Sequence, residues 1–299
     1  MKKRLILAGA ALAFGSWALM GANARAQTTI GALSNFALFL DGNGNVNIGN
    51  VAVMSGTPGD IGVDDGTVTL GNNSVYSRNV VQDNDGDGGV LQIGNYTTVV
   101  GECATDSGGS ISLGKGASCD EQSTDGSSTN LTNVENAEND EETFECAAWN
   151  QSYTQSFSSI NVAASKSFTV TDTVSGGLNV IYVDAGITIG GSGTLILSGG
   201  QYDQVVVLND GGLTMGYGSH ILLSGGLQPQ NVYITGNSLN VQNSSVLNGT
   251  IESENAGCTL GSGVTANGAL ICEGDTNIGP NLRLNFFPTQ ISLSVGCND

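Results

Sequence analysis

The heptapeptide ITIGGSG, residues 187–193, begins with the four-residue phrase that decides the fold: an apolar, a polar and an apolar residue, followed by glycine. The phrase occurs nine times, once with Gln242 in place of the glycine, and its starts are 46, 68, 91, 111, 187, 213, 239, 258 and 276. Seven of the eight gaps between starts are 18 to 26 residues, and one is 76. Alternation indicates short strands with one buried side, and repetition at this period is typical of solenoids. We therefore predict a β-solenoid.

Each coil of this solenoid should hold two or three strands. Further short apolar strands are expected between the phrases, at 180–183, 194–197, 204–208, 220–223 and 231–235. The glycine of the phrase either turns a corner with positive φ or lets a neighbouring coil approach closely. A β-sandwich is the alternative, but 45 glycines and only 6% aromatic residues favour the narrow core of a solenoid.

The 76-residue gap interrupts the coils. Residues 120–130 are a polar, Ser/Thr-rich linker, and 135–157 begin with acids suited to a helix N-terminus. Aromatic and small residues then recur at helical spacing, namely Phe144, Ala148, Trp149, Tyr153 and Phe157. We predict one amphipathic helix of about 15–20 residues. The fold class is therefore all-β with one helix: a discontinuous β-solenoid with a long α-helix packed along its flank.

The N-terminus has the pattern of a signal peptide, assigned to residues 1–26. MKKR supplies positive charge, residues 5–21 are apolar, and Ala24-Arg25-Ala26 forms a cleavage site before Gln27. An uncleaved anchor is the alternative. We expect a secreted bacterial protein with no membrane insertion after cleavage. Its single solenoid domain, 27–299, divides into N-terminal coils at 27–119, linker and helix at 120–165, and C-terminal coils at 166–299.

The chain is strongly acidic. It has 8 basic and 27 acidic residues, and four of the basic residues lie in the first 26, which leaves 4 − 27 = −23 afterwards. Such a surface repels phosphate backbones and anionic lipid headgroups and attracts divalent cations. We expect no nucleic-acid partner.

The six cysteines of an exported protein indicate a disulfide framework. Spacings of 16 and 14 residues predict two short bridges, Cys103–Cys119 and Cys258–Cys272. The third, Cys146–Cys297, follows by elimination and would fasten the helix to the C-terminal segment. A structural metal site is disfavoured by the absence of CxxC and by the single histidine.

A possible calcium loop is DNDGDGG, residues 83–89. Asp83, Asp85 and Asp87, followed by Gly88, reproduce the front of a calcium-binding loop, although Gly94 stands where a glutamate ligand would be expected. We predict weak calcium binding that stiffens the loop 82–90, and a solvated acidic turn is the alternative. No cofactor other than calcium is expected.

The polar residues inside the phrases are all uncharged. If the coils stack in register, these side chains form a flat file of Thr and Asn that could match ordered water or an ice surface. The candidate face consists of Thr188, Thr214, Asn240, Thr259 and Asn277. The structural alternative is that Thr favours strands and that Asn stacks into ladders for stability alone.

Three segments resemble the ice-binding-protein-like family of secreted bacterial and fungal β-solenoids: residues 35–63, the helical insertion, and residues 221–271. Bacterial surface-adhesin modules share the same pattern. The resemblance implies a few N-terminal coils, a long helix and then the remaining coils. It also implies ice binding, which is the activity of members of this family, whereas close architectural relatives serve in adhesion or have no known ligand.

Catalysis is not expected. Carbohydrate-cleaving β-helices use basic residues or clustered acids, and here only Asp64-Asp65 and the single His220 are suggestive. We expect a non-catalytic protein of extracellular surface binding, adhesion or matrix structure, whose partner is an extracellular surface, a glycan or other copies of itself. Ice binding through the Thr/Asn face is the alternative, and a polysaccharide-active β-helix enzyme is the second alternative.

Overall fold

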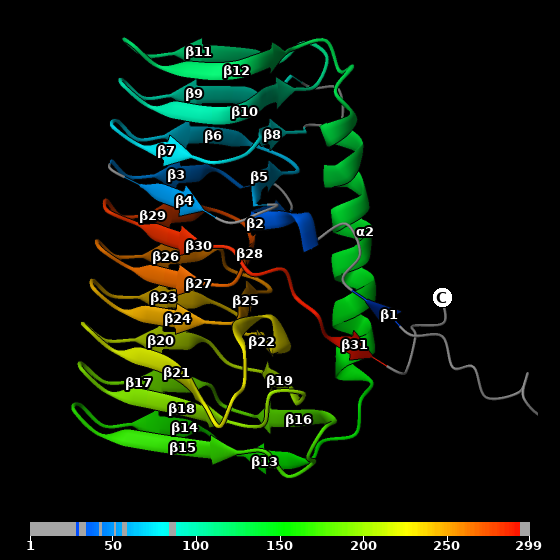
Figure 1. Ribbon diagram of the computed structural model, residues 1–299, viewed down its shortest axis with the longest axis vertical. Helices are drawn as coiled ribbons and strands as arrows, with labels where there is room; N and C mark the ends of the chain where they lie inside the picture. The colour runs from blue at the N-terminus through cyan, green and yellow to red at the C-terminus, as the bar shows by residue number, and fades with distance from the viewer. Residues whose placement is uncertain are drawn as a thin grey trace, which may run out of the picture.

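The computed structural model describes residues 28–29, 34–41, 44–50, 52–55, 59–83 and 88–293. Parallel strands form a stack of coils with one long helix, α2 (Thr129–Trp149), along its side (Figure 1). The predicted β-solenoid with a flanking helix is confirmed.

The coils have three faces. The first, here called the open face, is a ten-stranded parallel sheet, in stacking order β14 (Ile160–Val162), β17 (Ile187–Ile189), β20 (Leu213–Met215), β23 (Leu239–Val241), β26 (Cys258–Leu260), β29 (Thr276–Ile278), β3 (Val46–Ile48), β6 (Thr67–Leu70), β9 (Val90–Ile93) and β11 (Ser110–Leu113). All nine predicted phrases are strands of this one sheet.

The second face follows the open face along each coil. Its strands are β15 (Ser167–Thr171), β18 (Thr194–Ser198), β21 (His220–Ser224), β24 (Val246–Asn248), β27 (Thr265–Asn267), β30 (Arg283–Asn285), β4 (Val53–Ser55), β7 (Val75–Tyr76), and the first parts of β10 (Thr98–Thr105) and β12 (Ser118–Ser123).

The third face is covered by α2. Its strands are β13 (Gln155–Phe157), β16 (Leu178–Val183), β19 (Gln204–Asn209), β22 (Val232–Ile234), β25 (Thr250–Ser253), β28 (Leu270–Glu273), β2 (Phe36–Asp41), β5 (Asp60–Val63), β8 (Val80–Gln82), and the ends of β10 and β12. A short 3₁₀ turn, η2 (Pro229–Asn231), precedes β22, and β1 (Thr28–Thr29) pairs antiparallel with β31 (Ser292–Leu293).

The order of the coils in space differs from their order in the chain. The first N-terminal coil stacks on the last C-terminal coil, since β2, β3 and β4 pair in parallel with β28, β29 and β30 (Figure 1). The N-terminal coils then continue upward to β11 and β12. From there α2 runs back along the stack to β13 at the other end, so one continuous solenoid is built from two segments of the chain.

Aliphatic side chains fill the interior between the three faces. On the open face most strands bury their first and third residues and expose the middle one, as β17 and β20 do. The glycine that ends the phrase serves close approach: a Cβ at Gly216 would lie 2.6 Å from the backbone nitrogen of Gly191 in the next coil. The positive φ of the corner falls two residues later, for example at Gly218 with φ 61° and Ser192 with φ 56°.

Helix α2 starts earlier and stops earlier than the sequence indicated. The Ser128 side chain accepts a hydrogen bond from the backbone N–H of Asn130 and caps the first turn, while the acids lie in the middle of the helix and none is in its first turn. The helix stops at Trp149, and Tyr153 and Phe157 lie beyond it. Strands resume at Gln155, inside the segment predicted as linker and helix.

The helix packs through a second apolar cluster. Phe144 is completely buried, and its ring centroid lies 4.8 Å from that of Tyr233 in an edge-to-face pair. The same cluster includes Phe36 and Phe39 from the N-terminal coils, and α2 contacts β8 and β10 of those coils as well as β19 of the C-terminal coils. Packing against both segments lets α2 hold the two halves of the solenoid together.

Two of the predicted disulfides are present. Cys103–Cys119 joins β10 to β12, and Cys258–Cys272 joins β26 to β28, with Cα–Cα distances of 5.9 and 5.8 Å. For the third predicted bridge, Cys146 lies on α2 and Cys297 falls outside the described residues, so this bridge stays a prediction. The proposed signal peptide also lies outside the described residues. None of the helices that the structure describes is long and apolar enough to cross a membrane.

Candidate ligand-binding face

The outward side chains of the open face form one file in register. Thr188 pairs with Thr214, Thr214 with Asn240, and Asn240 with Thr259 on adjacent strands. The complete file, in stacking order, is Asn161, Thr188, Thr214, Asn240, Thr259, Asn277, Asn47, Thr69, Gln92 and Ser112. The five candidate residues from the sequence are consecutive, the second to the sixth members of this file.

The file is straight and regular because parallel strands impose one spacing. Neighbouring strands lie about 4.8 Å apart, so the nine intervals of the file span about 43 Å. Thr69 is half-buried and the other nine side chains are exposed. At the joint between the two chain segments, Asn47, Thr259 and Asn277 border a shallow hollow in this face. The result is a long row of small, uncharged polar groups.

Hydrogen bonding distinguishes this file from the structural asparagines of the corner beside it. At the corner, Asn72 accepts a bond of 2.6 Å from the backbone N–H of Asn95, and Asn50 accepts one of 2.7 Å from that of Asn72. In the file, the only side-chain bonds within the described residues are Asn47 to Asn277, at 3.4 Å, and Asn161 to Ser159. The corner amides therefore serve the fold, whereas most of the file remains available to water or a ligand.

One member of the file was not identified from the sequence. Asn161 lies in INVA, residues 160–163, where alanine replaces the glycine of the phrase. Its strand β14 has the same pattern of a buried, an exposed and a buried residue. The apolar–polar–apolar alternation without the glycine was the signal that could have found it. Alanine is accommodated because β14 is the last strand of the sheet.

The other two faces are unlike the open face. On the second face, neighbouring outward positions hold Thr265, Arg283 and Val53, so charge, hydroxyl and bulky apolar groups alternate. Val53 and Val75 are each 45% exposed there. The third face is covered by α2 (Figure 1). The second face also holds a short uncharged ladder, formed by Asn248, Asn267, Asn285 and Ser55, but these side chains hydrogen-bond to one another. Among the described residues, the open face therefore carries the longer polar file, and most of that file has no such partners.

The predicted calcium loop is only partly described. Asp83 follows β8 and is buried, with its backbone N–H donating to the carbonyl of Val63. Asp85 and Asp87 lie outside the described residues. Calcium binding by this loop stays a prediction.

Comparison with known proteins identifies the fold. No family model and no curated protein matches the sequence. Among solved structures, an ice-binding protein from an Arctic yeast is similar, with 13% identity, a TM-score of 0.51, and 88% of this chain and 96% of that chain covered. The DUF3494 domain of Shewanella frigidimarina ice-binding protein 1 is 15% identical with a TM-score of 0.54, covering 87% of this chain and 97% of that chain.

The chain has the fold of these ice-binding proteins. The predicted resemblance to the ice-binding-protein-like β-solenoids is confirmed at the level of fold. The similarity extends over nearly the whole length of both solved chains.

Proposed function

We propose that this protein binds ice through the open face. The observation that carries the proposal is the file of ten exposed or half-exposed uncharged side chains, aligned in register and mostly without hydrogen-bond partners in the protein. Two solved proteins with this fold are named ice-binding proteins, which supports ice over the adhesion or matrix role expected first from the sequence.

The geometry suits a solid water surface. A row of hydroxyl and amide groups at a repeat of about 4.8 Å can hold water molecules in a regular line. Each hydrogen bond contributes only about 0.5–1.5 kcal/mol net, so binding a crystal requires many such contacts at once. The parallel sheet holds the side chains in place beforehand, which lowers the entropy lost on binding. The lack of charge in the file avoids hydration shells that would conflict with a lattice.

The test is to watch single ice crystals grow in the purified protein. We expect the parent protein to produce faceted crystals or to arrest their growth. Thr214→Lys and Thr259→Lys should abolish this effect, because each places a long charged side chain in the middle of the file. Thr169→Lys, on an exposed position of β15 in the second face, is the matched control and should shape ice like the parent.

Circular dichroism should show that all three variants are folded. Round, unshaped crystals with the parent protein would contradict the proposal and would return surface binding or assembly as the better account. Loss of shaping in Thr169→Lys, with shaping retained in both file variants, would place the ice contact on the second face instead.

A further inference from the structure

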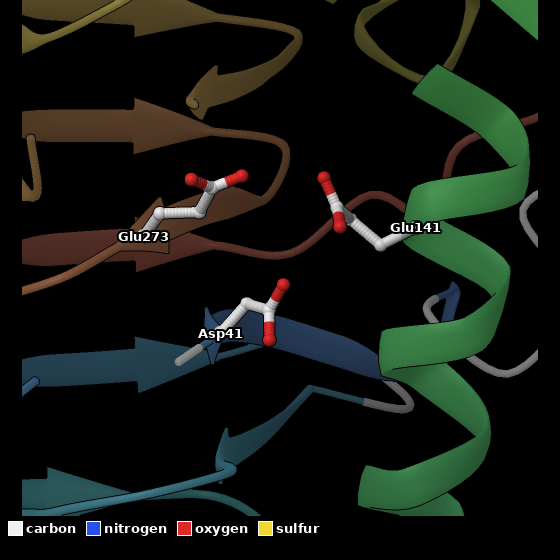
Figure 2. A group of neighbouring side chains, drawn as sticks. All are labelled: Asp41, Glu141 and Glu273. Atoms are coloured by element: carbon white, nitrogen blue, oxygen red, sulfur yellow. The ribbon is translucent and has the colours of Figure 1, made fainter. Parts of the chain in front are cut away.

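A cluster of carboxylates lies between α2 and the third face, on the side away from the file. Glu141 extends from the middle of α2 toward Asp41 at the end of β2 and Glu273 at the end of β28 (Figure 2). One carboxylate oxygen from each of the three lies within 4.8 Å of the others. Glu141 also belongs to a second group of the same size with Glu145 and Glu252.

The topology brings these acids together at one place. Asp41 and Glu273 are paired residues of β2 and β28, where the N-terminal coils meet the C-terminal coils. Glu252 lies on β25, the next strand of the same face. Glu141 and Glu145 are four residues apart and therefore project from one side of α2. The cluster thus draws its carboxylates from the N-terminal coils, from α2 and from the C-terminal coils.

Two of these carboxylates are buried with only other carboxyl groups as side-chain hydrogen-bond partners. Glu252 is 2% exposed and Glu141 is 1% exposed. In the described part of the chain, no N–H group and no hydroxyl donates to either oxygen of Glu252 or to one oxygen of Glu141. The side-chain partner of Glu252 is the carboxyl of Glu141, so the two acids must share a proton or a cation. Buried carboxylates are retained in proteins when they are paired or coordinate a metal. These two side chains therefore indicate a missing ligand at the cluster.

Among the described residues, no basic side chain forms an ion pair with these carboxylates. Within the part of the chain that the structure describes, the one ion pair is Arg78 with Asp60, away from this cluster. Burial, and then the carboxylates of Glu141 and Asp41, raise the pKa of Glu273 to about 8. Burial, followed by the charges of Glu254 and Glu141, raises the pKa of Glu145 to about 7. A bound cation would relieve this repulsion.

We propose that a calcium ion binds between α2 and the solenoid, with Asp41, Glu141 and Glu273 as its central ligands and Glu252 beside them. All of these ligands are carboxylate oxygens, which hard cations prefer, and no histidine or thiolate is present in the groups. Calcium accepts an irregular set of six to eight oxygens, whereas magnesium requires a small octahedral site. The hollow lined by Asp41, Asn255, Glu273 and Gly274 leaves room for water ligands.

The ion would fasten the two segments of the discontinuous solenoid. It would bridge Asp41 of the first N-terminal coil, Glu273 of the last C-terminal coil and Glu141 of the helix that returns between them. The site is separate from the predicted loop at Asp83, and it does not depend on the proposed ice face.

The test uses the full chain, freed of metal with a chelator and then titrated with calcium chloride. At a calcium concentration about 100 times the dissociation constant, we expect the melting temperature to rise by about 5 °C or more. Glu141→Gln should remove most of this rise and weaken calcium binding at least tenfold. Glu135→Gln, an exposed position on the same helix, is the matched control and should keep the full rise.

A second readout is terbium, a luminescent substitute for calcium. Trp149 at the end of α2 donates a hydrogen bond to Glu254 at 3.3 Å, near the cluster, and can sensitise terbium emission. We expect emission in the parent and in Glu135→Gln, displaced by calcium, and little in Glu141→Gln. Two results would overturn the proposal: an unchanged melting temperature of the parent with calcium, or a calcium response retained in Glu141→Gln and lost in Asp85→Ala.

Discussion

The packing of α2 predicts that Phe144 is the most sensitive position of the helix. Its side chain is completely buried between α2 and the third face, with its ring edge-to-face against Tyr233. The surrounding cluster includes Phe36 from the N-terminal coils and Val206 from the C-terminal coils. Phe144→Ala therefore opens a cavity at the place where the helix holds both segments.

The expected cost follows from this enclosure. Replacing a buried phenylalanine by alanine costs about 3–5 kcal/mol, and the upper part of that range applies where the surroundings cannot collapse into the cavity. Here β19 and β22 are fixed in the parallel stack, and the helix is anchored along its length by Leu131, Val134 and Ala148. We expect a loss of about 4–5 kcal/mol in the free energy of unfolding.

Equilibrium denaturation in guanidinium chloride measures this loss, monitored by circular dichroism. Phe287→Ala is the matched control, because its ring is 39% exposed, and we expect a cost below about 1 kcal/mol. A cost below about 1 kcal/mol for Phe144→Ala would refute the docking of α2 described here. A separate early unfolding transition in the variant would show that the two segments lose their coupling when the helix is loosened.

Three further substitutions test the coil geometry. Gly216→Ala should lower the free energy of unfolding by about 1–3 kcal/mol, because the new Cβ would lie 2.6 Å from the backbone of the next coil. Gly191→Ala is the control and should be tolerated, since its Cβ would have its nearest neighbour at 3.5 Å. Equal melting temperatures of the two variants would argue against the close approach. Replacing Cys258 and Cys272 together by alanine should cost about 3 kcal/mol, because the bridge closes a short loop, and chemical denaturation of the double variant measures it. Asn72→Ala should lower the free energy of unfolding by about 1 kcal/mol, because the backbone N–H of Asn95 loses its acceptor. Ice shaping should be unchanged, and a loss of shaping would show that the corner takes part in binding.

The strands of the open face could be predicted from the sequence because alternation is a local property. Each phrase specifies which side chains point inward, and stacking at one register then places the polar residues in a file. The disulfide pairs Cys103–Cys119 and Cys258–Cys272 could also be predicted from the sequence, because both join residues about one coil apart. Asn161 could not be predicted from the four-residue phrase because alanine stands in place of the glycine. The glycine is required where the preceding coil approaches closely, and β14 is the last strand of the sheet.

The sequence by itself determined the repeating coil, the existence of the helix and the composition of the outward file. Tertiary structure alone decided that Asn47 stacks on Asn277, 230 residues away, so that two short files become one. It likewise decided that Asp41, Glu141 and Glu273, from three distant segments, meet at one point. The physical reason is that a coil's own pattern fixes its inward and outward sides but not its neighbour. Which coils stack on one another depends on the helix, because α2 packs against both segments and returns the chain to the far end of the stack.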